Sequence, residues 1–215
     1  MSGNPRVKVA LLIAIVAAVP GHAAQEPTGD DAGLRTATGV KVDFAELIPL
    51  DLFVGPWRVV ENHFNARGEV IATVRGNEEI SWVLDRRAIR RIYTTSTESS
   101  VFRAIGMLTW NAAEKMYHGV WFDNRAKTGP VTMKGEWFPE SNTMEFTVET
   151  RGEDGSAIRY KVVERFVDEK RRVATTFLTT GGTVVKRMEV EYRRSIPCPD
   201  KIRAILDPDI VGITK

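Results

Sequence analysis

The sequence predicts an all-β protein whose single folded domain is an antiparallel, up-and-down barrel of about ten strands, preceded by a short helical turn. After Trp57 the chain alternates between apolar-rich segments and turn signals, at spacings close to the 8–12 residues typical of all-β barrels and sandwiches. The connections are nearly all of hairpin length, so consecutive segments should pair as antiparallel neighbours. A meander of this length avoids two exposed edges by pairing its last strand with its first, which favours a closed barrel.

The start of the chain is typical of a secretory signal peptide, which we assign to residues 1–24. Arg6 and Lys8 precede an uncharged run from 9 to 19, and small residues follow it. The run is shorter than the roughly 20 apolar residues that span a bilayer, so we expect cleavage and no membrane insertion afterwards. The sequence therefore predicts an exported protein, either periplasmic or secreted.

The mature chain divides into three parts. Residues 25–42 have no hydrophobic period and are predicted to be a disordered spacer, 43–195 form the barrel domain, and 196–215 form a tail. The one cysteine, Cys198, lies in that tail, so the barrel must be stabilised by burial alone. A domain of this size hides roughly 70% of its unfolded surface, which is sufficient.

Charge argues against nucleic acid as a partner. The chain has 30 basic and 28 acidic residues, and two of the basic residues are lost with the signal peptide. The mature protein is thus neutral and lacks the electrostatic footprint of a nucleic-acid or anionic-lipid binder. The local clusters at 86–87 and 170–172 fall in predicted turns, where solvated charges are expected. Nothing in the sequence indicates an oligomeric state.

The helical turn is predicted before the first strand. Asp43 and Glu46 have capping-box spacing, so a turn should run through Leu47 or Ile48 and end at Pro49. We expect it to cover the bottom of the barrel.

Trp57 is predicted to close the same end. It follows Gly55 and Pro56 and occupies the first position of the first strand, where a large ring fills the barrel base. A guanidinium near the end of the last strand, from Arg193 or Arg194, should stack on the indole, an interaction of about 0.5–2 kcal/mol.

The strands follow from alternation and turn signals. We expect a bulge at Gly76 in the second strand. In the seventh, Met144, Phe146 and Val148 share one face, and in the last, Val184 and Met188 share the apolar face with Val190 and Tyr192. The predicted strands are 57–64, 69–84, 88–97, 102–110, 116–123, 131–137, 143–150, 157–167, 172–180 and 183–193.

Several blocks resemble a known family. They are the Leu-x-x-Phe-Val-Gly-x-Trp opening, the segments at 107–111, 117–124 and 134–137, and the closing 186–193. Over about residues 45–194 the chain resembles a bacterial family catalogued as a domain of unknown function, which is similar to the calycin superfamily of lipocalins, fatty-acid-binding proteins and nitrobindin-like barrels. The resemblance implies that Gly55 and Trp57 form the calycin Gly-x-Trp and that Arg193 or Arg194 is the closing arginine. It supports a fold and leaves the activity open.

Arg90 and Arg91 are adjacent in the third strand, so one of them must face the interior. We favour Arg91, which shares a face with Tyr93. An arginine and a tyrosine in an apolar barrel make a site for a carboxylate or phenolate on an apolar ligand. The alternative is that Arg91 pairs with an interior Glu78 or Glu164.

Other charges also fall on predicted inner faces. Alternation from Trp57 directs Glu61 and His63 inward, near the opposite mouth. Glu164 shares its face with apolar side chains, and so does Lys186, which lies between Val184 and Met188. Because an unpaired charge in a dry barrel costs several kcal/mol, each needs a partner, a ligand or water, which favours a polar, solvated pocket.

No cofactor is expected. His63 and His118 stand alone, without the spacing of a preformed metal site, and the third histidine leaves with the signal peptide. One imidazole suffices as an axial haem ligand, so haem held by His63 or His118 is the alternative. Arg58, Val59 and Val60 follow Trp57 where nitrobindin-like haem barrels have Gly-x-Trp-x-Gly-x-Gly, which argues against haem.

These features predict a barrel that binds a small apolar or amphipathic molecule, including an anionic one. The expected lining is Arg91, Tyr93, Trp121, His118 and Lys186, with the aromatics and polar loop of 121–130 at the mouth. The alternative is a cofactor-independent lyase, isomerase or hydrolase, with His118, Tyr93, Asp123 and Glu164 as candidate catalytic residues. A structural or protein-interaction role would require a solidly filled interior. An open cavity of roughly 300 Å³ or more lined by Arg91 and Tyr93 would favour ligand binding.

Overall fold

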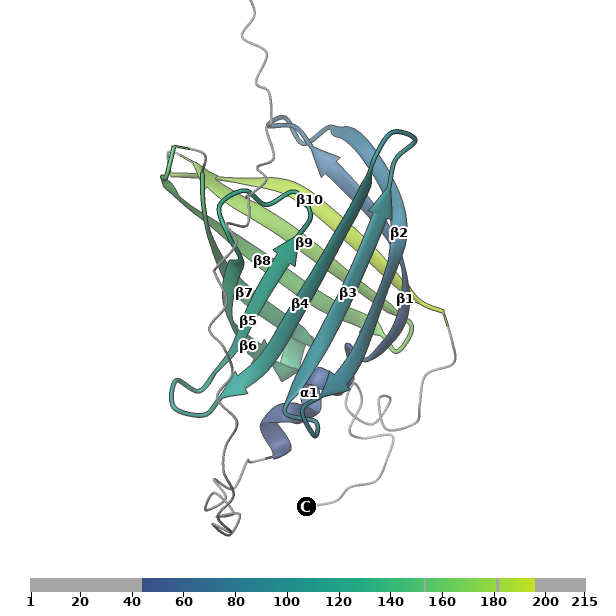
Figure 1. Cartoon of the computed structure of the whole chain (residues 1–215), viewed down its shortest axis with the longest axis vertical. Coiled ribbons are helices and arrows are strands. Elements are labelled where there is room, and N and C mark those ends of the chain that lie inside the picture. Colours follow the sequence, from purple (N-terminus) through teal and green to yellow (C-terminus); the bar gives the residue numbers. More distant parts are fainter. Residues whose placement is uncertain (1–43, 153, 181, 196–215) are drawn as a thin grey trace, which may run out of the picture.

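The computed structural model describes residues 44–152, 154–180 and 182–195, and within them ten strands form one closed antiparallel barrel (Figure 1). Each strand pairs with its sequence neighbours, and β1 pairs with β10. This confirms the predicted fold class. The predicted signal peptide, spacer and tail all lie outside the described residues. The strands are β1 (Gly55–Phe64), β2 (Val70–Val83), β3 (Ala88–Ser96), β4 (Val101–Asn111), β5 (Met116–Asp123), β6 (Val131–Phe138), β7 (Thr143–Arg151), β8 (Ala157–Asp168), β9 (Arg171–Thr180) and β10 (Thr183–Arg194).

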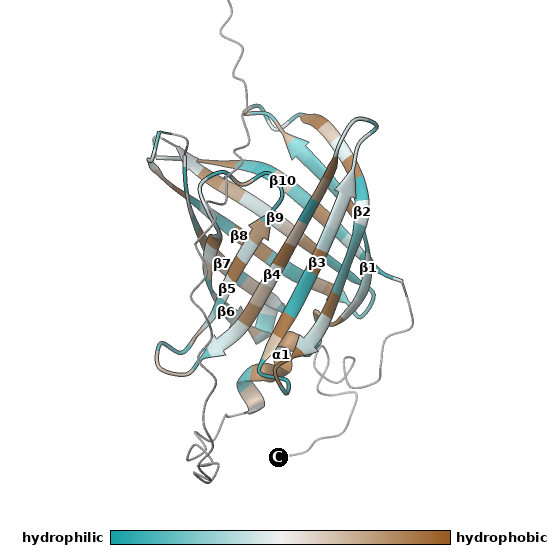
Figure 2. Ribbon diagram, viewed as in Figure 1, coloured by the Kyte–Doolittle hydropathy of each residue, from teal (hydrophilic) through white to brown (hydrophobic). Residues whose placement is uncertain are grey.

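The side chains alternate between the inside and the outside of the barrel, as the sequence pattern predicts. In β7, Met144, Phe146 and Val148 are buried, and the residues between them are more exposed. Figure 2 shows the resulting alternation of hydrophobic and hydrophilic residues along the strands. The inner faces of all ten strands together enclose the core.

A short helical segment covers one end of the barrel (Figure 1). It consists of a 3₁₀ turn, η1 (Phe44–Leu47), and one turn of α-helix, α1 (Ile48–Asp51). The prediction that Pro49 ends the helix is wrong. Pro49 lies in the first turn of α1, where a backbone N–H has no helical partner and its absence costs nothing.

Hydrogen bonds, and an ion pair between Asp51 and Arg86, tie this segment to the barrel. The Trp82 indole N–H donates to Asp51 Oδ1 at 2.7 Å, and the Tyr117 hydroxyl donates to the Glu46 carbonyl at 2.6 Å. Leu50, in α1 itself, and Leu52, just after it, are completely buried. The segment therefore closes the barrel base, as expected.

Trp57 and Arg194 join the first strand to the last. The Trp57 indole is buried and donates to the Phe53 carbonyl at 2.7 Å, while the Arg194 guanidinium carbon lies 4.1 Å from the centre of its ring. Arg193 is exposed and pairs with Glu191, so the closing arginine is Arg194. Gly55 has φ +129°, and a Cβ there would lie 2.6 Å from Arg194 Nη1, so only glycine fits this approach.

The bulges differ from the prediction. Strand β2 pairs without interruption through Gly76, so the bulge predicted there is wrong. Gly76 instead permits a close approach of β3, because a Cβ would overlap the Thr94 carbonyl. The observed register shifts lie at His63/Phe64, Phe166/Asp168 and Lys186/Met188.

The shift in β10 changes which side chains face inward. It inserts Arg187 as an extra residue, so that Met188 faces the interior while Lys186 lies opposite Phe177 on the outer face. Val184, predicted on the apolar face, is 64% exposed. The prediction that both share a dry face with Met188 is therefore wrong.

Candidate ligand-binding cavity

The half of the barrel away from α1 contains a cavity of about 420 Å³. Arg91 and Tyr93 line it, as does Trp121, so these three predicted lining residues come together. Arg91 is buried and Arg90 is exposed, which confirms the favoured orientation of this pair. Much of the wall is apolar, and six of the aliphatic side chains in it are Val74, Val131, Met133, Val148, Val162 and Met188.

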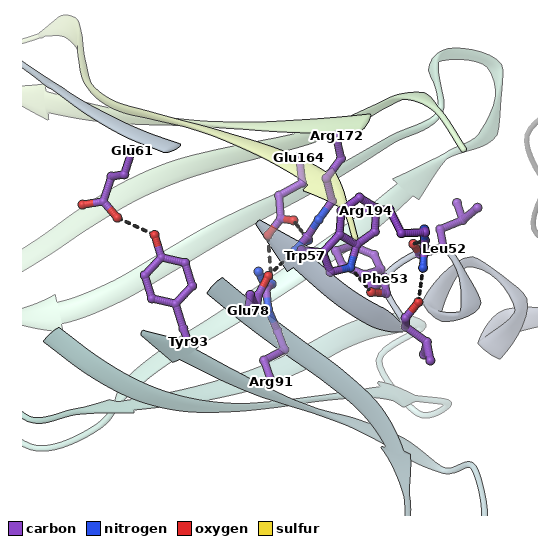
Figure 3. A network of polar contacts seen from close by, with 11 residues as sticks. Leu52, Phe53, Trp57, Glu61, Glu78, Arg91, Tyr93, Glu164, Arg172 and Arg194 are labelled. Atoms are coloured by element: carbon purple, nitrogen blue, oxygen red, sulfur yellow. Dashed lines mark hydrogen bonds and ion pairs between the residues drawn. The ribbon is translucent and has the colours of Figure 1, made fainter. Parts of the chain in front are cut away.

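Four buried charged side chains, Glu78, Arg91, Glu164 and Arg172, form a ring that we call the ion-pair ring (Figure 3). Arg91 and Glu164 line the floor of the cavity, and Glu78 and Arg172 pair with them. Arg91 Nε lies 2.7 Å from Glu78 Oε1, and Arg91 Nη1 lies 2.9 Å from Glu164 Oε1. Arg172 Nη1 lies 2.5 Å from Glu164 Oε2, and Arg172 Nη2 contacts Glu78 Oε2. Each carboxylate thus bridges both guanidinium groups, and the ring carries no net charge.

Glu164 and Arg91 stay ionised in spite of their burial. For Glu164, burial favours the neutral acid, but the charges of Arg91 and Arg172 and their hydrogen bonds outweigh it and lower its pKa. For Arg91, burial favours the neutral base, but the charges of Glu164 and Glu78 outweigh it and raise its pKa. Arg91 therefore pairs with both glutamates named in the alternative interpretation. Its guanidinium is neutralised and is not the free anion site that we predicted first.

Aromatic side chains surround Arg172, the member of the ion-pair ring that lies farther from the cavity. The Arg172 guanidinium carbon lies 3.8 Å from the centre of the Tyr192 ring, 4.9 Å from that of Trp57 and 5.2 Å from that of Phe53. Arg172 is fully buried, although the sequence placed it in a cluster expected to be solvated. Charge balance could have predicted a second buried cation, because Glu78 and Glu164 together need two cations and Arg91 supplies only one.

A second polar group lies above the ring, toward the mouth. Glu61 Oε2 accepts a hydrogen bond of 2.5 Å from the Tyr93 hydroxyl, and Glu61 Oε1 lies 2.5 Å from His63 Nε2. All three side chains line the cavity, and we call them the Tyr93–Glu61–His63 group. The inward orientation of Glu61 and His63 follows the predicted alternation from Trp57, but no sequence pattern groups these two residues with Tyr93.

In this group Glu61 is ionised and Tyr93 keeps its proton. Burial favours protonated Glu61, but hydrogen bonds from His63 and Tyr93, with the charges of His63 and Arg125, outweigh it and lower its pKa. Burial and the nearby charges of Tyr192 and Glu61 raise the pKa of Tyr93 far above its usual value. Tyr93 is therefore a neutral donor to an ionised Glu61.

Arg125 lies at the rim of the cavity. Its Nη2 donates to Ser100 Oγ at 3.0 Å, and its guanidinium carbon is 5.3 Å from the centre of the Phe102 ring. Among the residues that the structure describes, no carboxylate lies within 4 Å of its guanidinium. The loop after β5, predicted to lie at the mouth, thus supplies a cation there. The sequence pattern did not single out Arg125 as that cation.

Two predicted lining residues lie outside the cavity. Alternation in β5 points Tyr117 and Trp121 inward and His118 outward, where its Nε2 is 3.3 Å from Glu114 Oε2. Lys186 Nζ lies 2.6 Å from Glu189 Oε2 on the outer surface, because of the bulge in β10. Asp123 accepts a hydrogen bond of 2.8 Å from the Arg125 backbone N–H and does not line the cavity.

The haem alternative depended on His63 or His118. His118 is on the outer face, and His63 Nε2 contacts Glu61. In the described part of the chain, no three side chains of His, Cys, Asp or Glu gather in an arrangement that could hold a metal ion.

Among the described residues, none of the helices has the length and apolar character that a membrane span requires.

The closed meander, the helical cover and the indole–arginine closure define a ten-stranded, calycin-like β-barrel with an internal cavity. Comparison with family profiles places the chain within one family. The chain belongs to the family described as "Protein of unknown function (DUF1579)", which matches residues 48–194.

Solved structures show a similar architecture at low sequence identity. Rv2717c from M. tuberculosis matches with a TM-score of 0.52 and 12% identity, over 70% of this chain and 98% of that chain. The S-type phycobiliprotein lyase CPES from Guillardia theta matches with a TM-score of 0.48 and 14% identity, over 73% of this chain and 95% of that one. A search of curated proteins found no match. The likeness to Rv2717c supports the fold alone.

Proposed function

We propose that the barrel binds one small amphipathic molecule in its cavity. The observation that carries this proposal is a 420 Å³ space, lined by Arg91 and Tyr93, that the protein's own side chains leave unfilled. Its volume falls within the roughly 300–1,000 Å³ of small-molecule sites, and such sites combine apolar walls with a few polar groups. A purely structural barrel would gain stability by filling this space, because close packing is favourable.

The charges of the cavity suggest how the ligand is oriented. The apolar body of the ligand would pack against the valine and methionine wall. An anionic group would be repelled by ionised Glu61 at mid-depth and would find no unpaired cation at the floor, where the ion-pair ring is neutral. Arg125 at the rim has no carboxylate partner among the described residues. The anionic end therefore lies at the mouth, and a hydrogen-bond donor of the ligand can meet Glu61.

A signal-peptide pattern supports a proposal about where binding takes place. Residues 1–24 have the charged, apolar and small-residue regions of a secretory signal. We place the binding event in the periplasm or outside the cell, and fractionation of cells that express the full chain tests this assignment. Retention of the unprocessed chain in the cytoplasm would contradict it.

Titration with 8-anilinonaphthalene-1-sulfonate, a fluorescent amphipathic anion, tests the cavity. The purified protein should bind one equivalent with enhanced, blue-shifted emission. Val148→Trp, which fills the cavity wall, should abolish this signal, whereas Val167→Trp, at an exposed position, should not. Circular dichroism establishes that both variants are folded, and native mass spectrometry of the unliganded preparation identifies any copurified molecule. Equal dye binding by the two tryptophan variants would contradict an internal site.

The Tyr93–Glu61–His63 group favours a second candidate, a cofactor-independent enzyme. If His63 donates its Nε2 proton to Glu61, Nδ1 carries the lone pair and is a general base oriented by a carboxylate. Such a base beside an apolar cavity suits abstraction of a proton from a bound molecule, the first step of many isomerase and lyase reactions.

A generic proton-abstraction substrate tests this candidate. In 5-nitrobenzisoxazole, a base removes the proton from C3, the N–O bond breaks and a coloured cyanophenolate forms, so no other reactant is needed. The protein should accelerate this reaction, His63→Ala should abolish the acceleration, and His118→Ala on the outer face should retain it. Equal rates in the protein and His63→Ala would leave ligand binding as the function.

A further inference from the structure

The strand register places three arginines side by side on the outer face of the neighbouring strands β1, β10 and β9. Arg58 is directly opposite Arg193 in the β1–β10 pair, and Arg193 is directly opposite Arg171 in the β10–β9 pair. Directly opposite residues in antiparallel strands have Cβ atoms about 4.5–5.5 Å apart, and like charges at such positions destabilise the pair. The register therefore places three positive charges in an unfavourable row.

A fourth arginine and one glutamate complete what we call the arginine cluster. Arg75 is exposed and lines, together with Arg58 and Arg193, a shallow surface hollow of about 350 Å³. Glu191 also lines this hollow, with Oε1 2.6 Å from Arg193 Nη2 and Oε2 3.4 Å from Arg171 Nη2. Within the described ranges, neither Arg58 nor Arg75 has a carboxylate within 4 Å. Four guanidinium groups thus share one carboxylate.

The rest of the outer surface shows how the barrel otherwise arranges its charges. Arg159 is directly opposite Glu149 and pairs with it at 2.7 Å, and Lys161 Nζ lies 2.6 Å from Glu145 Oε2. Opposite charges face each other across those strands, which is the stabilising arrangement. The cluster is a local excess of positive charge on a chain that is nearly neutral overall.

We propose that the arginine cluster is a binding site for a phosphate group, separate from the cavity. Guanidinium groups bind phosphate oxygens through paired, charge-assisted hydrogen bonds, and two unpaired ones match a dianionic phosphate. The side chains of Arg58, Arg75 and Asn77 around the hollow are exposed, so a phosphate group can reach them from solvent. The phosphate is either a free one or the headgroup of an anionic lipid, and the experiment distinguishes these two sources.

Inorganic phosphate is the first probe, titrated into the full-length mature protein at low ionic strength and monitored by calorimetry. Arg58→Ala and Arg75→Ala should each weaken binding about tenfold, as expected for loss of one charge-assisted contact. Arg159→Ala removes an equally exposed arginine that has its own glutamate, and it should leave binding unchanged. Equal weakening in all three variants would show non-specific attraction and overturn the site.

Cosedimentation with vesicles is the second arm. Binding to phosphatidylglycerol vesicles but not to inorganic phosphate or phosphatidylcholine vesicles, with loss in Arg58→Ala, would assign the phosphate to a lipid headgroup. Binding to inorganic phosphate alone would assign it to a soluble ligand. Absence of binding in both arms would overturn the proposal.

Stability provides an independent check of the repulsion. In phosphate-free buffer of low salt, Arg58→Ala should raise the urea midpoint of unfolding, and the gain should vanish at high salt, where the repulsion is screened. Arg159→Ala should lower the midpoint or leave it unchanged. A lower midpoint in Arg58→Ala at low salt would contradict the repulsion on which the site rests.

Discussion

The Arg194 guanidinium stacks on the Trp57 indole, with 4.1 Å between the guanidinium carbon and the ring centre. The same group donates to the carbonyls of Leu52, at 2.8 Å, and of Val54. One side chain at the end of β10 thus holds the start of β1 and the segment that leads from α1. Closure of the barrel and attachment of its helical cover therefore depend on the same contact.

Replacing this arginine should open the seam between the first and last strands. We expect Arg194→Gln to lower the free energy of unfolding by about 3 kcal/mol, because several backbone carbonyls lose a charged donor and the indole loses its stacked cation. The exposed neighbour Arg193 provides the control, since Arg193→Gln should change the free energy of unfolding by less than about 0.5 kcal/mol in physiological salt. Urea denaturation measures both, and equal losses would contradict the assignment of Arg194 as the closing residue.

The ion-pair ring should behave as one unit. Arg172→Met leaves two buried glutamates with one arginine and should cost about 3–5 kcal/mol. The double variant Arg172→Met/Glu164→Gln restores neutrality, with Glu78 still paired to Arg91, and should cost about 2 kcal/mol less than the sum of the single changes. Urea denaturation of the three variants measures this coupling, and additive losses would show that the four charges do not act together.

The ring also predicts how stability changes with pH. The folded-state pKa of Glu164 lies below its unfolded value of 4.5, so its contribution to stability is present above pH 4.5 and is lost as the pH falls through the lowered value. Glu164→Gln lacks this titration. The difference in free energy of unfolding between the natural protein and this variant should be largest near neutral pH and shrink in acid. A difference that is constant from pH 7 to pH 3 would show that Glu164 does not titrate as described.

Tyr93 should control the ionisation of Glu61. Tyr93→Phe removes the hydroxyl donor, so the pKa of Glu61 should rise and the free energy of unfolding should fall by about 2 kcal/mol. Carbon-13 NMR titration of the glutamate carboxyl groups measures the shift, with Glu114 on the outer surface as the internal reference. An unchanged Glu61 titration would mean that the hydrogen bond from Tyr93 contributes nothing to it.

Arg125 should determine the preference for anionic ligands. We expect Arg125→Ala to weaken binding of 8-anilinonaphthalene-1-sulfonate about tenfold, the effect of losing one charge-assisted contact. Binding of N-phenyl-1-naphthylamine, which has the same rings without the sulfonate, should not change. Fluorescence titration compares the two dyes, and an equal loss for both would place Arg125 in the packing of the mouth instead of in recognition of the anion.

The residues that were placed correctly from sequence are those governed by local rules. The strict alternation in β7 depends on neighbouring residues, and the structure has it as predicted. Arg91 faces inward for the same reason. The first strand begins at Gly55, two residues before the predicted start at Trp57, because Gly55 and Pro56 already pair with β2. Lys186 fails because one extra residue in β10 reverses the alternation, and a bulge is set by the partner strand, not by the bulged segment itself.

The candidate site depended on contacts that sequence distance hides. Glu78, Arg91, Glu164 and Arg172 come from four different strands, and their pairing is determined by how the barrel closes. His118 was chosen for its chemistry, whereas the imidazole at the cavity is that of His63, beside Glu61 and Tyr93. The sequence predicts that buried charges must be paired, but it does not predict which residue pairs with which.

The amino-acid sequence by itself determined an all-β meander of ten strands, its turns and the indole that closes it, because periodicity and turn chemistry act over a few residues. The tertiary structure alone decided which charges neutralise one another, where the bulges fall and how much space the closed barrel leaves. The physical reason is that burial and electrostatic pairing depend on distances between strands, and these distances exist only once the first strand has paired with the last.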